Sequence, residues 1–166
     1  MEISLRAVEP TDIDFLYRME NTPQVWNVSW GDAPVSRQML WEYINAYTAD
    51  IYADRQLRLI VTADGTPVGT VDISDFDPRN SRAMLGVAIE DEHRRKGIAT
   101  KAVSLTIDYC RNTLALHQLA VMVPKYNDTS LALFTKLGFR TAGCLRSWLR
   151  HGRGFSDVVL MQRMLQ

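Results

Sequence analysis

The sequence has little cysteine and no long apolar run, and each shortage excludes a class of protein. Its two cysteines, Cys110 and Cys144, lie far apart and outside any CxxC pattern, which excludes a disulfide scaffold. No stretch approaches the roughly 18 apolar residues of a membrane span. The N-terminus also lacks the charged start and apolar segment of a signal peptide. We therefore expect a cytoplasmic protein with reduced thiols.

Net charge is also absent, but the two parts of the chain differ strongly in sign. Up to Glu92 there are sixteen acidic and seven basic residues, whereas from His93 onward there are three acidic and twelve basic residues. Such a split favours one environment for an anionic ligand and another for a cationic one. The alternative is that the two parts interleave in space and neutralise each other.

Apolar periodicity predicts one mixed α/β domain spanning residues 1–166. At 166 residues and 46% hydrophobic composition, the chain is long enough to bury a core without staples. Helical spacing predicts a first helix with Thr11 as its N-cap. Three further helices are predicted over residues 36–54, 95–114 and 127–136. Strand patterns occur at residues 2–8, 57–63, 68–76, 82–89, 119–123, 139–150 and 155–163.

The most informative segment, residues 84–99, reads MLGVAIEDEHRRKGIA. An apolar strand leads through an acidic turn into a basic start of a long helix that contains Gly97. Free N–H groups and the positive end of the dipole make a helix start suitable for phosphate. Glycine there permits close approach of a ligand to the backbone. The alternative is an exposed basic turn with a tolerated glycine.

This segment resembles the acetyl-CoA pyrophosphate loop of the GNAT N-acetyltransferases. The similarity covers Arg94-x-x-Gly97-x-Ala99, and it continues in a second segment, Asn127-Asp128-x-Ser130 followed by Leu133-Phe134-x-Lys136-Leu137-Gly138-Phe139-Arg140. Leu5-Arg6 with Asp12, and Val68-Gly69, also fit. The branch that it most resembles contains the spermidine and ribosomal-protein N-acetyltransferases. The resemblance implies a GNAT fold: a central, mostly antiparallel twisted sheet of about seven strands with helices on both faces.

The resemblance further implies a set of residues that bind acetyl-CoA as co-substrate, with no metal. Backbone groups of the strand would pair with the pantetheine, amides of the helix start would hold the pyrophosphate, and the second segment would approach the pantetheine and adenosine. The residues implied are Val87, Ala88, Ile89, Arg94, Arg95, Lys96, Gly97, Ile98, Ala99, Thr100, Asn127, Ser130, Phe134 and Lys136.

The catalytic pattern of the polyamine branch is incomplete in this chain. That branch uses a tyrosine as general acid where this chain has Phe134, and a glutamate where it has Met84. The hydroxyl of Ser130, the hydroxyl of Tyr126 and water are alternative proton donors to the departing thiolate. Loss of a general acid slows transfer by roughly 10²–10⁴-fold without abolishing it.

Two aspartates are candidates for binding the acceptor amine. Asp72 matches an acidic position of the polyamine branch, and Asp32 lies near another. The alternative for both is a solvated carboxylate. Aromatic residues are similarly either core or walls of the amine site through cation–π contacts: Trp26, Trp30, Trp41, Tyr43 and Tyr47.

We therefore expect an acetyl-CoA-dependent N-acetyltransferase that acts by direct transfer on a primary amine, with a polyamine such as spermidine as the first candidate. The alternatives are acetylation of the N-terminus of a ribosomal protein, and a CoA-binding protein with weak catalysis. The histidines show no metal spacing, and no pattern indicates nucleic acid or a membrane as a partner. A homo-oligomer is compatible with the resemblance, because relatives often pair through sheet edges or helices.

Overall fold

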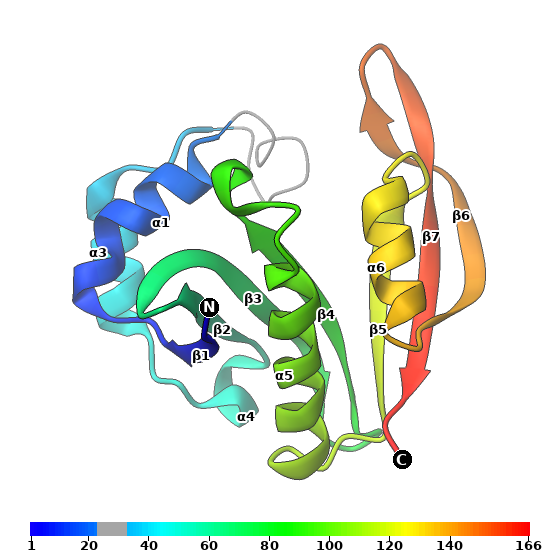
Figure 1. The fold of residues 1–166 in the computed structure, drawn as a ribbon, viewed down its shortest axis with the longest axis horizontal. Coiled ribbons are helices and arrows are strands. Elements are labelled where there is room, and N and C mark those ends of the chain that lie inside the picture. Colours follow the sequence, from blue (N-terminus) through cyan, green and yellow to red (C-terminus); the bar gives the residue numbers. More distant parts are fainter. Residues whose placement is uncertain (23–32) are drawn as a thin grey trace.

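The computed structural model describes residues 1–22 and 33–166, which form a single seven-stranded sheet with helices on both faces (Figure 1). The strand order is β1-β2-β3-β4-β5-β7-β6, and each neighbouring pair is antiparallel except β4 and β5, which are parallel. The mixed α/β class and the mostly antiparallel sheet expected from the sequence are therefore confirmed.

The strands follow the predicted ranges closely, because alternation of apolar and polar residues is a local signal. They are β1 (Ile3–Ala7), β2 (Leu57–Ala63), β3 (Thr66–Asp77), β4 (Arg82–Ile89), β5 (Gln118–Pro124), β6 (Arg140–His151) and β7 (Gly154–Met164). The helices are η1 (Pro10–Asp12), α1 (Ile13–Glu20), α3 (Arg37–Ala46), α4 (Ile51–Asp54), η2 (Asp91–His93), α5 (Ile98–Asn112) and α6 (Asp128–Lys136).

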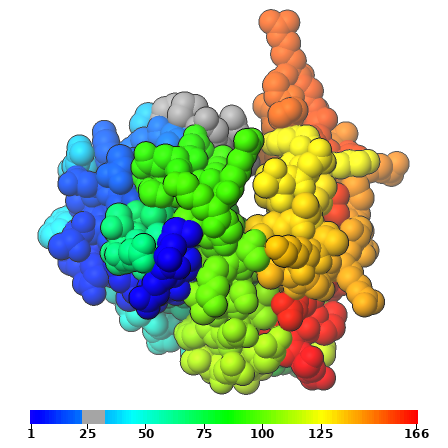
Figure 2. Space-filling model, in the orientation of Figure 1, coloured from blue at the N-terminus to red at the C-terminus, as the bar shows by residue number. Residues whose placement is uncertain are grey.

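Two apolar clusters hold the helices on opposite faces of the sheet. On one face, Leu16 of α1 and Leu40 of α3 pack with Ile60 of β2. On the other, α5 buries Ile98 and Val103, and α6 buries Phe134, in the larger cluster. At roughly 25 cal/mol per Å² of apolar surface, this burial is the main stabilising term. Figure 2 shows the β6–β7 hairpin projecting beyond the body of the molecule.

The prediction of one helix over residues 36–54 is wrong, because the chain breaks after Ala46. Ser36 is the N-cap of α3 as expected, and its hydroxyl accepts the Met39 N–H at 3.1 Å. Tyr47 is extended, and Ala49 has a φ of 56°. Asp50 then caps α4 by accepting the N–H groups of Tyr52 and Ala53. The spacing of apolar residues does not reveal the extended Tyr47 or the left-handed Ala49 that interrupt the helix.

Thr11 as the N-cap of the first helix is also wrong. The helical segment begins as η1 at Pro10 with Glu9 as its N-cap. The Asp12 carboxylate accepts the Glu9 N–H at 2.7 Å, and it also accepts two hydrogen bonds from Arg6, at 2.7 Å each. Asp12 thereby ties the end of β1 to the helix start, and the N-caps are Glu9 for η1 and Asp12 for α1.

Candidate functional site

The parallel strands β4 and β5 pair at one end only. Their register runs from Arg82↔Gln118 to Met84↔Ala120. Beyond that pair, β4 continues to Ile89 and β5 to Pro124, and the described residues supply no further pairing between them. Figure 1 shows the two strands diverging. One edge of β4 is therefore left open to an extended ligand, which can pair with it as an added strand.

The direction of the backbone groups on this open edge follows from one hydrogen bond. The N–H of Glu90 donates to the carbonyl oxygen of Val68, at the start of β3, at 2.9 Å. Because successive residues of a strand point their backbone groups to opposite sides, those of Ile89 and Val87 face the gap toward β5. Ala88, the third residue in the expected set, instead joins the ladder with Thr70 of β3. Its side chain packs beside the α1–α3 cluster.

The segment after β4 presents a run of unpaired amides. Arg95 has a φ of 62° and Gly97 a φ of 77°, and α5 begins only at Ile98. Among the described residues no carbonyl accepts the N–H groups of residues 95–100, and the next one, of Lys101, donates to Gly97 at 3.1 Å. Left-handed residues that alternate with ordinary ones form an anion-binding concavity, and the helix dipole adds to it.

The predicted helix start at Arg95 is therefore wrong by three residues. Two left-handed residues interrupt the helical backbone, which apolar periodicity does not reveal. The correction concerns only the boundary, because the segment still ends in a helix N-terminus. Arg95, Lys96 and Gly97 are exposed, whereas the Ile98 side chain is buried in the core. Ala99 and Thr100 are half-buried in the first turn of α5.

Arg94 has partners within this loop. Its Nε–H donates to the carbonyl oxygen of Ile89 at 3.0 Å, and its guanidinium pairs with Asp91 at 2.9 Å. The side chain thus connects the end of β4 to the turn that carries the unpaired amides. The resemblance implies that Arg94 binds the cofactor directly. The structure shows in addition that Arg94 supports the loop through its contacts with Ile89 and Asp91.

The second predicted segment also begins at the open end of the sheet. Parallel β4 and β5 are each followed by a helix, so the N-termini of α5 and α6 lie at the carboxyl ends of diverging strands, where α/β proteins bind ligands. Asn127 caps α6 by accepting the Ser130 N–H at 3.1 Å. Ser130 is half-buried and Lys136 is exposed.

The two aromatic positions of this segment differ in burial. Phe134 is 4% exposed, and its ring stands edge-on to Phe139 with centroids 5.2 Å apart. Tyr126 is 45% exposed and stacks on the His151 ring at 4.0 Å. A hydroxyl is therefore present at the surface of the loop after β5 and absent at the buried position.

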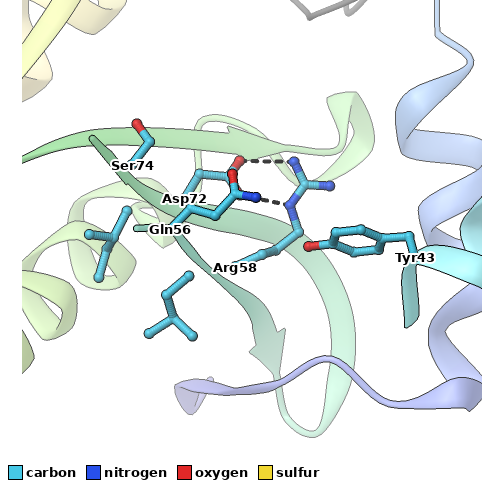
Figure 3. A pocket seen from close by; sticks show the side chains of 7 residues that line it. Tyr43, Gln56, Arg58, Asp72 and Ser74 are labelled. Carbon is cyan, nitrogen blue, oxygen red and sulfur yellow. Dashed lines mark hydrogen bonds and ion pairs between the residues drawn. The ribbon is translucent and has the colours of Figure 1, made fainter. Parts of the chain in front are cut away.

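Asp72 lies in a cluster that sequence reasoning did not assemble. Arg58 of β2 donates to both carboxylate oxygens of Asp72, at 2.7 and 3.0 Å, and to Glu20 of α1 at 2.6 Å. The pair lines a cavity of about 100 Å³ together with Tyr43, Gln56, Leu57, Ile73 and Ser74 (Figure 3). The sequence feature that could have indicated this cluster is a lone arginine, Arg58, in the apolar strand Leu57–Ala63. No feature of the sequence indicates that Glu20 belongs to it.

The remaining expected residues have varied surroundings. Asp32, Trp26 and Trp30 lie outside the described residues. Trp41 is 46% exposed, whereas the Tyr47 hydroxyl donates to the carbonyl oxygen of Arg58 at 3.2 Å. Burial, the largest cause, raises the pKa of Tyr47 to about 12, which makes this phenol a weaker acid than an ordinary tyrosine.

His93 lies near acidic residues, although its sequence spacing indicated no metal. Ligand atoms of Glu90, Glu92 and His93 come within 4.8 Å of one another. Glu90 also pairs with Arg18 at 3.3 Å. No helix among the described residues has the length and apolar character to span a membrane.

The family model of the acetyltransferase (GNAT) domain matches residues 2–140. This chain belongs to the GNAT acetyltransferase family. The family's acetyl-CoA-dependent N-acetyltransferase activity, expected from the sequence, is thereby confirmed.

Individual GNAT proteins resemble the chain over most of its length. It is 28% identical to the spermidine N(1)-acetyltransferase of Escherichia coli K12 over 141 residues, which are 85% of this chain and 74% of the relative. It is 28% identical to the putative ribosomal N-acetyltransferase YdaF of Bacillus subtilis over 161 residues, 95% of this chain and 88% of the relative. The structure of Vibrio cholerae spermidine N-acetyltransferase with CoA and spermine has a TM-score of 0.86 at 25% identity, covering 98% and 95% of the two chains.

Proposed function

We propose that residues 1–166 act as one cytoplasmic N-acetyltransferase domain that moves the acetyl group of acetyl-CoA to a primary amine of a polyamine such as spermidine. The E. coli relative and the V. cholerae structure are spermidine N-acetyltransferases. A dodecameric structure of the V. cholerae enzyme supports a homo-oligomer as the working form. Neither a metal nor nucleic acid is part of the proposal.

The single observation that carries the proposal is the open edge of β4 leading to the unpaired amides of residues 95–100. In this assignment, Val87 and Ile89 pair with the amide groups of the pantetheine, and the amides at the start of α5 bind the pyrophosphate. The exposed side chains of Arg95, Lys96 and Lys136 add positive charge for the phosphates. The thioester then lies in the gap beyond Met84 and Ala120.

The chemistry requires two proton movements. A protonated amine, with an ordinary pKa near 10.4, must lose a proton before its nitrogen attacks the thioester carbonyl carbon. The new N–C bond forms, the C–S bond breaks, and the proton that the acylated nitrogen releases is passed to the CoA thiolate. Phe134 has no proton to give, so water or the hydroxyl of Ser130 or Tyr126 carries that proton to the thiolate.

A second candidate is acetylation of a protein N-terminus. The observation in its favour is that Arg58 already pairs with Asp72, which lowers the negative charge available to a polycation. The similarity to YdaF points the same way. A CoA-binding protein with weak catalysis remains the third alternative, because Phe134 and Met84 replace the acid and carboxylate of the polyamine branch.

One experiment separates the three. CoA release from acetyl-CoA is measured with spermidine, with a peptide that has a free N-terminus, and with buffer alone. Saturable release with spermidine at low concentration supports the first proposal, and release with the peptide alone supports the second. CoA binding by calorimetry without amine-dependent release supports the third.

A further inference from the structure

Arg58 stands at an unusual place for a cation. It lies within the apolar strand β2, and its side chain is 10% exposed. A buried charge is costly unless it is paired and hydrogen-bonded. Here the guanidinium holds Asp72 through two hydrogen bonds and Glu20 through a third, at 2.6 Å. Figure 3 shows the Asp72 carboxylate facing the Arg58 guanidinium, and the Tyr43 hydroxyl pointing toward the Arg58 side chain from the other side.

This cluster lies next to the gap in which the thioester is proposed to sit. Asp72 is opposite Gly86 in the register of β3 and β4, and β4 forms one side of the gap. Opposite residues of paired strands share a face of the sheet. An added Cβ at Gly86 would meet no described atom within 4 Å, so the described residues leave space at this position, opposite Asp72. The Asp72 side chain is 40% exposed.

Among the residues that the structure describes, the charges of Glu20, Arg58 and Asp72 do not cancel. Glu20 and Asp72 carry two negative charges and Arg58 one positive charge. Without the guanidinium, the two carboxylates would attract ammonium groups at both positions; with it, one charge is neutralised. Because the Asp72 side chain is 40% exposed, the local dielectric is close to that of water, and adding or removing one charge within a few ångströms there changes the affinity for a cation on the order of tenfold.

We propose that Arg58 is a specificity-determining positioning residue. By neutralising one of the two carboxylates of Glu20 and Asp72, it sets how strongly the enzyme prefers acceptors that carry more positive charges. This inference rests on the proposed amine acceptor. In this assignment Arg58 acts through the two carboxylates and not on a reacting atom. The wild-type enzyme, with one net negative charge in this cluster, then prefers a triamine to a monoamine by a moderate factor, and loss of Arg58 increases that preference.

The test is a charge series at constant ionic strength. The values of kcat and KM are measured for butylamine, 1,4-diaminobutane and spermidine with the wild type, Arg58→Gln, Asp72→Asn and the double variant Arg58→Gln/Asp72→Asn. Relative to the wild type, these variants change the cluster charge by −1, +1 and 0. Glu20→Gln, which also adds +1, serves as a second carboxylate variant.

We expect the ratio of the butylamine KM to the spermidine KM to follow the charge. Arg58→Gln raises it about tenfold, Asp72→Asn and Glu20→Gln lower it about tenfold, and the double variant returns it to near the wild-type value. A purely structural role predicts that the double variant is impaired at least as much as either single one. Ratios that do not change with charge, or a double variant that fails to restore the ratio, overturn the inference.

Two controls keep the result interpretable. CoA binding by calorimetry shows that each variant is folded and keeps its cofactor site. If Arg58→Gln does not fold, Asp72→Asn and Glu20→Gln still keep the inference falsifiable, because an unchanged ratio in both would show that Arg58 has no amine-binding carboxylate to neutralise. A wild-type enzyme that acetylates none of the three amines overturns the proposed function as well, whereas normal acetylation with an unchanged ratio overturns only this inference.

Discussion

The Nε–H of Arg94 donates to the carbonyl oxygen of Ile89 at 3.0 Å, across the turn that separates β4 from α5. Ile89 is the last residue of the open β4 edge, and Arg94 also pairs with Asp91 at 2.9 Å. The contact therefore fixes the amides that follow Arg94 relative to the strand that precedes it. A pyrophosphate site built from backbone groups depends on this kind of support, because backbone donors cannot reorient independently of the chain.

Replacing Arg94 tests this support. We expect Arg94→Ala to raise the KM for acetyl-CoA roughly tenfold, the effect of losing a charge-assisted hydrogen bond, with a smaller change in kcat. Arg94→Lys keeps the charge but loses the forked donor, so it should resemble Arg94→Ala in steady-state kinetics. A lysine variant that behaves as wild type would instead mean that only the charge matters.

Gly97 is a direct test of the amide turn. Its φ of 77° disfavours any other residue, and the proposed phosphates lie against its backbone. Gly97→Ala should weaken CoA binding through backbone strain of about 1–2 kcal/mol. Gly97→Glu should weaken it at least tenfold more through charge repulsion, as measured by calorimetry. Equal affinities for CoA in the wild type and the glutamate variant would remove this turn from the site.

Gly86 offers a way to close the acceptor face without disturbing the fold. Because an added Cβ meets no described atom within 4 Å, Gly86→Val should leave the melting temperature and CoA affinity unchanged. We expect the KM for the amine to rise at least tenfold, since the valine side chain fills the space between Asp72 and the gap. Gly143→Val, at an equally open position on β6, is the matched control and should leave the KM unaltered.

Phe134→Tyr restores the hydroxyl that the polyamine branch uses as its acid. We expect unchanged CoA affinity and a faster acetyl-transfer step, up to roughly 10²-fold, in single-turnover measurements. Phe139→Tyr places the same hydroxyl on the ring that stands edge-on to Phe134, and it should give no acceleration. A slower reaction with Phe134→Tyr would show that the ring itself packs against the acetyl group.

The Arg6–Asp12 pair predicts a pH dependence of stability. Burial alone raises the pKa of Asp12, but the hydrogen bonds from Arg6 and from the Glu9 N–H outweigh it and hold that pKa below its ordinary value of 3.8. A depressed pKa in the folded state stabilises the protein above pH 3.8, and this contribution is lost as the pH falls through the lower, folded-state pKa.

Asp12→Asn should therefore lower the free energy of unfolding at pH 7 by roughly 1–3 kcal/mol, between the values for surface and buried pairs. It should also flatten the dependence of that free energy on pH below about pH 4, in denaturant titrations. Asp14→Asn removes an exposed partner of Arg37 and should change neither quantity appreciably. An Asp12→Asn variant with the wild-type slope in acid would refute the assignment.

The sequence alone determined the features that depend on neighbouring residues. The alternation of apolar and polar residues predicted the strands. The glycine-containing basic segment before Ile98 predicted the helix start that carries the unpaired amides, with an error of three residues in its position. These signals are local because strand pleating and helix termini involve residues a few positions apart. The resemblance then supplied the family.

Only the tertiary structure decided where the strands separate and which charges meet. The gap beyond Met84 and Ala120 depends on how far β4 and β5 stay in register, which neither strand encodes by itself. Arg58 meets Asp72 across 14 residues and Glu20 across 38, on three different elements. Packing of α1 against the sheet brings Glu20 there, because burying apolar faces aligns distant segments regardless of their separation along the chain.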